Sequence, residues 1–303
     1  MPLKILRLPL LLLILLLPFG ASANFDFNPN CVKAYQNIFE LKLNTARQLI
    51  AAEKKAHPNN AIVPLLENYV DYFYLLTTES KSEFERLETN KSKRMDQISD
   101  DDKNSPYYLY AQAQVNLQWA LVRGRYGAYL TAAREISKAN SQLNENAKKF
   151  PGFHPNGIGL GLINAVMGAL PDGFLKSTLS TFGLKGSMQY GLNTLEKLAE
   201  NLPKSTYEPF YEEAVFNYAY VLSDVAKSNQ AYAKTMKYTA RIADSSLLKS
   251  YLQAYVCARN GHTDEAIKIL ADRPSGNIYQ PFPYLEYLTG IAKLNKLDLT
   301  AAN

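Results

Sequence analysis

The chain has 303 residues, of which 47% are hydrophobic and 12% aromatic, and this is enough apolar material for a large buried core. The composition therefore excludes an intrinsically disordered protein. The formal charge is +5, or +3 once Lys4 and Arg7 leave with the leader described next, and so small an excess argues against binding to nucleic acid.

The first 23 residues have the pattern of a secretory signal peptide. Lys4 and Arg7 form a basic start, residues 10–17 an apolar run, and Ala21-Ser22-Ala23 a cleavage motif of small residues. A retained membrane anchor is the alternative, but the run is shorter than the roughly 20 residues that span a bilayer. We therefore expect export to a periplasmic or secreted location, with association with the cell envelope left open.

Residues 24–151 are predicted to form an N-terminal region of helical repeats. Residues 30–58 fit one tetratricopeptide unit, because Ala34, Ala46 and Pro58 lie twelve residues apart, at the small and proline positions of that repeat. Further helices are expected over 62–76, 84–98, from the cap Ser105-Pro106 onward, and over 128–149.

Residues 152–202 are predicted to form a glycine-rich, apolar insertion of three short helices. From 157 to 170 the only polar side chain is Asn164, and Pro171 ends this helix. Small residues recur along one strip where another backbone can come close, namely Gly157, Gly161, Ala165 and Gly168. A buried core helix, a membrane-inserting hairpin and a ligand pocket are all open, and the short length favours the buried core.

The same stretch resembles a known family. The resemblance rests on a series of glycines and leucines: Gly157, Gly159, Leu170-Pro171, Leu175, Gly183, Gly186, Gly191-Leu192 and Leu195. Together they resemble the signature of the tetratricopeptide-repeat 39 / inclusion-body clearance protein family, with departures at Gly168, Leu184 and Ser187-Met188. The resemblance implies an all-helical repeat scaffold that works through protein contacts, with links to lipid and protein homeostasis in the relatives. It does not imply catalysis.

Residues 203–303 are predicted to be C-terminal tetratricopeptide-like repeats. Helices are expected over 207–226 and 231–243, and residues 247–274 fit the repeat because Ala254 and Ala266 lie twelve residues apart. A further unit opens at Tyr284 and the chain stops inside it. We therefore expect an incomplete last repeat, in a fragment or in a chain completed by a partner. The whole chain is predicted to be an all-α, tetratricopeptide-like superhelix with a buried central insertion.

The sequence contains no combination of residues that indicates catalysis, a cofactor or a metal. Its three histidines do not lie at metal-ligand spacing, and the G-x-S-x-G, H-E-x-x-H, C-x-x-C and P-loop motifs are missing. Cys31 and Cys257 could form a disulfide in an oxidising compartment, but each lies in an apolar helical pattern, which favours two free buried thiols.

The sequence is rich in tyrosine, with 21 residues, and this is the feature of its composition that best suits a binding surface. Tyrosine combines an apolar ring with a polar tip, so it can contact both apolar and polar groups of a partner. The candidate partner-binding residues are Tyr211, Tyr218 and Tyr232. The predicted function is a non-enzymatic scaffold for a protein or peptide partner, with peripheral contact to membrane lipid left open. The alternative is a carrier of a lipid or other apolar ligand in a cavity lined by Ile158, Leu162, Val166, Phe174 and Phe182.

Overall fold

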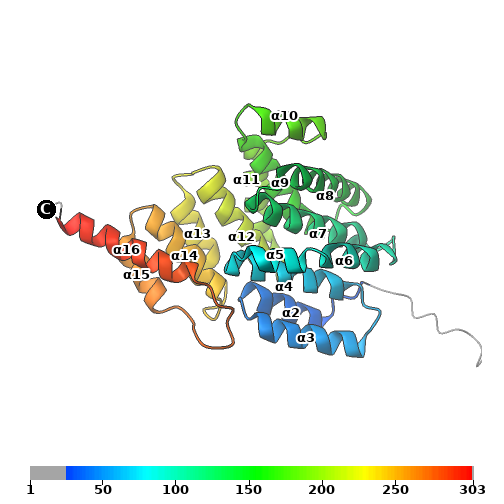
Figure 1. The fold of residues 1–303 in the computed structure, drawn as a ribbon, viewed down its shortest axis with the longest axis horizontal. Helices are drawn as coiled ribbons and strands as arrows, with labels where there is room; N and C mark the ends of the chain where they lie inside the picture. Colours follow the sequence, from blue (N-terminus) through cyan, green and yellow to red (C-terminus); the bar gives the residue numbers. More distant parts are fainter. Residues whose placement is uncertain (1–24, 302–303) are drawn as a thin grey trace, which may run out of the picture.

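The computed structural model describes residues 25–301, and this part of the chain is all-helical, as the sequence predicts (Figure 1). No β-strand occurs among these residues. The predicted signal peptide over 1–23 lies outside the described residues. None of the helices in the described part has the length and hydropathy needed to cross a bilayer.

The N-terminal helices are α2 (Pro29–Phe39), α3 (Leu43–Ala56), α4 (Ile62–Thr78), α5 (Lys81–Leu87), α6 (Asn90–Ser99), α7 (Pro106–Arg125) and α8 (Tyr129–Lys149). The central helices are α9 (Asn156–Ala169), α10 (Phe174–Thr181) and α11 (Met188–Asn201). The C-terminal elements are the 3-10 turns η1 (Leu202–Lys204) and η2 (Glu208–Phe210), then α12 (Tyr211–Tyr220), the π-helical turn η3 (Val221–Val225), α13 (Ala231–Thr239), α14 (Leu247–Arg259), α15 (Thr263–Ala271) and α16 (Tyr284–Ala301). Most helices pack against the helices that precede and follow them in the chain.

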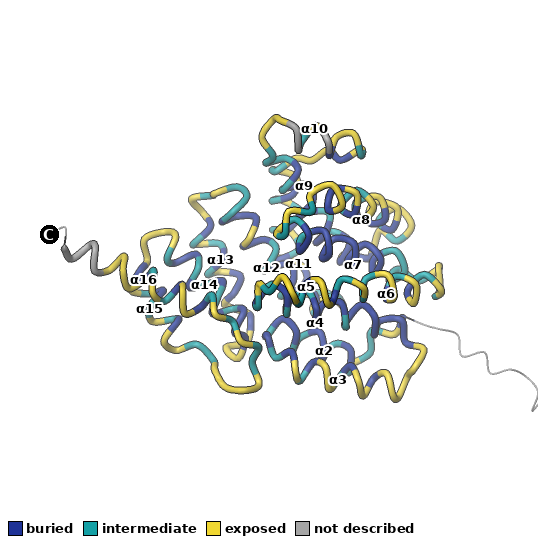
Figure 2. The backbone as a smooth tube through the Cα atoms, viewed as in Figure 1, coloured by how far each residue is buried: buried dark blue, intermediate teal, exposed yellow. Residues whose placement is uncertain are grey.

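The core runs along the inner helices of this array. Figure 2 shows buried residues concentrated along α4 and α7, whereas α3 and α8 carry exposed residues on their outer faces. The start of α7 matches the sequence prediction, because Ser105 accepts a hydrogen bond from the backbone N–H of Tyr107 at 3.2 Å and Pro106 occupies the first turn. Unlike a typical surface helix, α7 also buries four amide side chains: Gln112, Gln114, Asn116 and Gln118.

The segment predicted as one helix over 84–98 is instead two short helices, which is a correction to the sequence analysis. Helix α5 ends at Leu87 and α6 begins at Asn90. At the break, Glu88 pairs with Arg123 of α7 at 2.8 Å, and Lys91 pairs with Glu135 of α8. Arg123 and Glu135 also pair with each other, so residues on both sides of the break belong to one largely buried ion-pair network with α7 and α8.

Helix α9 of the central stretch is buried and packs through its small residues, as predicted. The segment around α10 is a correction to the predicted buried insertion, because most of the described residues from 171 to 187 are exposed (Figure 2). Helix α9 lies against α11, whereas α10 contacts α8. A Cβ atom added to Gly191 of α11 would lie 2.5 Å from the backbone N of Ala165, and one added to Gly168 would lie 2.2 Å from the backbone N of Met188. The two backbones therefore touch along the predicted strip, and only glycine fits at these two contacts.

The two cysteines are free and buried, so the predicted alternative of a disulfide is not what the structure contains. Cys31 belongs to the main core, and Cys257 to a separate small cluster with Ala266 and Ala292. Burial raises the pKa of both thiols to about 12. Both residues therefore serve as small apolar core residues rather than as nucleophiles.

Candidate functional site

A cleft of about 350 Å³, which we call the aromatic cleft, lies where the N-terminal, central and C-terminal helices meet. Its walls come from α4, α7, α9, α12, α14 and the segment that leads into α16. Most of the side chains that line it are aromatic or aliphatic: Tyr72, Phe73, Leu76, Leu121, Leu162, Phe216, Tyr220, Leu248, Tyr251, Leu252, Tyr255, Phe282 and Tyr284. The size lies at the lower end of the range for small-ligand sites and suits one or two side chains of a partner.

One wall of the cleft is shaped by a local change of helix type. Helix α12 continues into the π-helical turn η3, in which the N–H of Ala226 donates to the carbonyl of Val221 at 2.8 Å. The helical stretch ends at Lys227, whose backbone is in the left-handed region with a φ of 47°. Asn217, Tyr220, Ser223 and Asp224 of this stretch all line the cleft. Single π turns are uncommon and occur frequently at functional sites.

Another part of the wall is held by a connecting segment, residues 272–283, which we call the strap. It leads from α15 back to the turn between α2 and α3, where the N–H of Gln280 donates to the carbonyl of Leu41 at 2.7 Å. The hydroxyl of Tyr279 donates to the carbonyl of Ser245 at 3.0 Å. These bonds fix the position from which Phe282 and Tyr284 reach the cleft.

Charged groups at the cleft are paired. The Asp224 carboxylate accepts hydrogen bonds from the hydroxyl of Tyr255 at 2.5 Å and from the guanidinium of Arg259 at 3.3 Å, both on the same oxygen, Oδ1. Glu79 and Arg125 form an ion pair that also lines the cleft. The charges of the four groups therefore balance.

Several polar atoms that line the cleft have no hydrogen-bond partner among the described residues. Ser223 is only 7% exposed, yet its hydroxyl is unpartnered. The hydroxyls of four tyrosines also make no hydrogen bond within the described chain, and these are Tyr72, Tyr220, Tyr251 and Tyr284. Burial raises the pKa of all four, so they remain neutral hydroxyls at physiological pH. The cleft thus combines aromatic ring faces with hydroxyl groups that have no hydrogen-bond partner within the described chain.

A smaller cavity of about 20 Å³ adjoins the cleft and shares Tyr72, Phe73, Phe216 and Asn217 with it. Its lining includes Glu213, a carboxyl group that is only 5% exposed. Burial raises the pKa of Glu213 to about 7, while hydrogen bonds from tyrosine hydroxyls act in the opposite direction. The donors come from three helices: Tyr35 at 2.5 Å, Tyr69 at 2.8 Å and Tyr110 at 3.5 Å.

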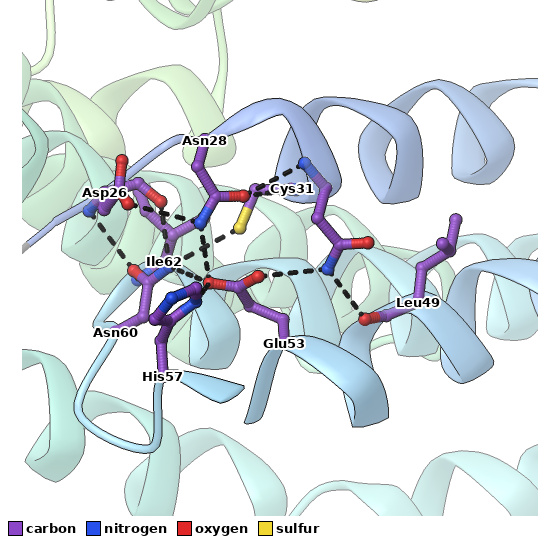
Figure 3. Close-up of polar contacts among 9 residues, drawn as sticks. Asp26, Asn28, Cys31, Leu49, Glu53, His57, Asn60 and Ile62 are labelled. Carbon is purple, nitrogen blue, oxygen red and sulfur yellow. Dashed lines mark hydrogen bonds and ion pairs between the residues drawn. The ribbon is translucent and has the colours of Figure 1, made fainter. Parts of the chain in front are cut away.

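A second polar cluster, around Glu53, lies near the start of α2 (Figure 3). The Glu53 carboxylate accepts hydrogen bonds from the amides of Asn28 at 2.7 Å, Asn30 at 3.0 Å and Asn60 at 2.8 Å, and pairs with His57 at 2.9 Å. Burial opposes ionisation, but these bonds together hold the pKa of Glu53 below its usual value. The three asparagine amides that donate to Glu53 also donate elsewhere in the cluster, to Asp26 and to the carbonyl of Leu49, so the cluster ties α2, α3 and the loop after α3 together. No group of side chains in the described part of the chain has the makeup of a metal site.

The three tyrosines singled out from the sequence lie outside the aromatic cleft. Tyr211 is buried and donates to the carbonyl of Tyr238 at 2.6 Å. Tyr218 is also buried, and Tyr232 stacks on His262 with 3.7 Å between ring centroids. Their partner-binding role stays a prediction. The residues that line the cleft were missed because they come from distant parts of the chain, although Tyr220 belongs to the same tyrosine-rich stretch.

The predicted lipid cavity is only partly assembled. Leu162 lines the aromatic cleft and, together with Ile158, the smaller cavity. Val166 and Phe182 are half-buried and line neither one. The side chain of Phe174 lies outside the described residues.

Comparison of the chain with protein-family models, with curated protein sequences and with solved structures found no match.

Proposed function

We propose that the protein is a non-enzymatic binding protein whose aromatic cleft holds a side chain of a protein or peptide partner. The observation that carries this proposal is the cleft itself, an opening lined mainly by aromatic and aliphatic side chains together with unpartnered hydroxyl groups. Rings supply apolar contact at low entropic cost, and hydroxyl groups can bond a peptide backbone or a polar side chain.

The proposed architecture is a tetratricopeptide-like superhelix. Support comes from α2 and α3 and from α14 and α15, two helix pairs that pack against each other. In each pair the small residues that lie twelve positions apart are fully buried: Ala34 with Ala46, and Ala254 with Ala266. This is what the repeat requires where its two helices touch.

We also propose that residues 1–23 direct export and are removed, so that the mature chain begins at Asn24. Intact-mass measurement of the protein recovered from its native compartment tests this. Recovery of the full-length chain would contradict the cleavage.

Site-specific photo-crosslinking in cells tests the binding proposal. A photoreactive phenylalanine analogue replaces Tyr220, which lines the cleft and is 42% exposed. The matched control is the same replacement at Tyr190, which is 56% exposed and lies on α11 outside the cleft. We expect a protein or peptide adduct at Tyr220 that does not form at Tyr190.

Other adducts would overturn the proposal. A lipid adduct at Tyr220 with no protein partner would establish the carrier alternative, in which Leu162 connects the central helices to the cleft. Equal labelling at the two positions would show that the cleft does not select a partner.

A further inference from the structure

We propose that the group held by the aromatic cleft is a primary ammonium at the end of an alkyl chain, as in a lysine side chain. The inference rests on the proposed binding function and specifies its ligand.

The rings provide the first argument. A tyrosine ring has a negative face that attracts a cation within about 6 Å of its centroid. The cleft presents five such rings: Tyr72, Tyr220, Tyr251, Tyr255 and Tyr284. At the cleft margin, the guanidinium of Arg259 already lies 5.3 Å from the centroid of the Tyr255 ring. The same wall therefore accommodates a cation on one of its rings.

Unused oxygen atoms provide the second argument. Tyr255 and Arg259 both bind Oδ1 of Asp224, which leaves Oδ2 without a partner among the described residues. The adjacent Ser223 hydroxyl is buried and unpartnered. Both residues line the cleft, and an ammonium has three N–H donors and no acceptor, so each of these oxygens offers it an acceptor. A purely apolar group would leave the Ser223 hydroxyl buried without a hydrogen bond, which is unfavourable.

The charge around the cleft does not oppose a cation, which is the third argument. Arg125 and Arg259 each pair with a carboxylate, Glu79 and Asp224, so these charged groups at the cleft and its margin carry no net positive charge.

Calorimetric titration of the mature chain tests the inference with two pairs of probes. One pair is n-pentylammonium against 1-pentanol, which has the same number of heavy atoms. The other is a pentapeptide with an acetylated N-terminus, an amidated C-terminus and one lysine between two phenylalanines, against the same blocked peptide with norleucine in place of lysine. We expect each cationic probe to bind about tenfold more tightly than its neutral counterpart. A preference confined to the peptide pair indicates a lysine of a polypeptide partner, and an equal preference in both pairs indicates that a free amine suffices.

Variants locate the site. Asp224→Asn and Ser223→Ala should each reduce the affinity for the cationic probes severalfold and leave the neutral probes unchanged. Asp244→Asn is the matched control, because this carboxylate is 99% exposed and pairs with Lys249 outside the cleft. If Asp224→Asn lowers the melting temperature, the affinity of Ser223→Ala for the cationic probes decides the test. This substitution breaks no hydrogen bond within the described chain.

The outcomes separate this inference from the proposed function. Equal affinity for cationic and neutral probes overturns the inference but leaves an apolar binding cleft intact. Absence of binding by all four probes, together with equal crosslinking at Tyr220 and Tyr190, overturns both.

Discussion

Gln280 and Leu41 are joined by a backbone hydrogen bond of 2.7 Å, which connects the strap to the turn between α2 and α3. Leu41 holds a left-handed conformation, with a φ of 60°, that turns its carbonyl toward this contact. The connection between α15 and α16 therefore contacts the turn between α2 and α3, and Leu41 of that turn lines the aromatic cleft.

Amide hydrogen exchange should reveal this contact. The N–H of Gln280 is expected to exchange slowly, whereas that of Ile278, which is 49% exposed and has no backbone acceptor, should exchange fast. Gln280→Pro removes the donor and should lower the free energy of unfolding by about 1 kcal/mol. Equal exchange rates at the two positions would show that the strap is open in solution.

Glu213 makes stability depend on pH. Its pKa rises on folding from 4.5 to about 7, so the folded protein holds a proton that the unfolded chain has already released. Stability should therefore fall as the pH rises from about 4.5 to about 7, by roughly 3 kcal/mol from this group. Urea unfolding at a series of pH values measures the slope.

The variant Glu213→Gln cannot titrate, and its slope should be shallower than that of the parent. Some slope will persist toward pH 8, because burial and the nearby Glu40 and Glu208 raise the pKa of Glu212 to about 8. If the parent and the variant have the same slope, Glu213 is not the titrating group.

The stability of the protein should respond differently to replacement of two helical glycines by alanine. Gly191→Ala places Cβ against the backbone of α9 and should cost about 1 to 3 kcal/mol. At Gly124 of α7 no atom lies within 4 Å of the added Cβ, so Gly124→Ala should be neutral or stabilise by up to about 1 kcal/mol. Thermal melts compare the two. If Gly191→Ala melts like the parent but loses affinity for liposomes, the central stretch is a membrane contact and not core.

The Glu53 cluster should be sensitive to loss of its carboxylate. Glu53→Ala leaves the amides of Asn28, Asn30 and Asn60 without an acceptor and should cost about 3 kcal/mol. Glu85→Ala, which removes a carboxylate that is 62% exposed, should change stability by less than about 0.5 kcal/mol.

The cost of Glu53→Ala should also depend on pH. Since the pKa of Glu53 is lowered on folding, the stabilisation is present above the pKa of the unfolded chain and is lost as the pH falls below about 4. A destabilisation that stays constant down to low pH would argue against an ionised Glu53.

Thiol labelling should distinguish the folded from the unfolded chain. Both cysteines are fully buried, with pKa values raised to about 12, so neither should react with a disulfide reagent in native buffer. Two thiols should react in urea without a reductant. Labelling of none in urea would indicate a disulfide that the structure does not contain.

Local patterns predicted much of the fold. The small residues of α9 lie at helical spacing, which indicates a close helix contact before the partner helix is known, and α11 proved to be that partner. The cap at Ser105 and the burial of both cysteines are also properties of short segments. The break between α5 and α6 was missed because no glycine or proline marks it in the sequence, and the ion pairs beside it involve Arg123 and Glu135, which are distant in the chain.

The aromatic cleft could not be predicted in the same way. Periodicity shows which residues of a helix are apolar, but it does not show which of them face a void rather than a neighbour. Tyr218 and Tyr220 lie two positions apart on α12, and one is buried in the core while the other lines the cleft. That difference arises from the helices packed around them, which the sequence does not specify locally.

The strap also determines when the cleft can form during synthesis. Tyr72 and Phe73 emerge early, whereas Phe282 and Tyr284, which complete the walls, emerge only after α15. Helices α2 to α8 can pack through contacts between chain neighbours, but the cleft requires contacts between distant segments, which form slowly. A nascent chain therefore passes through most of its folding without the aromatic cleft, whose walls are complete only when the last helices have packed.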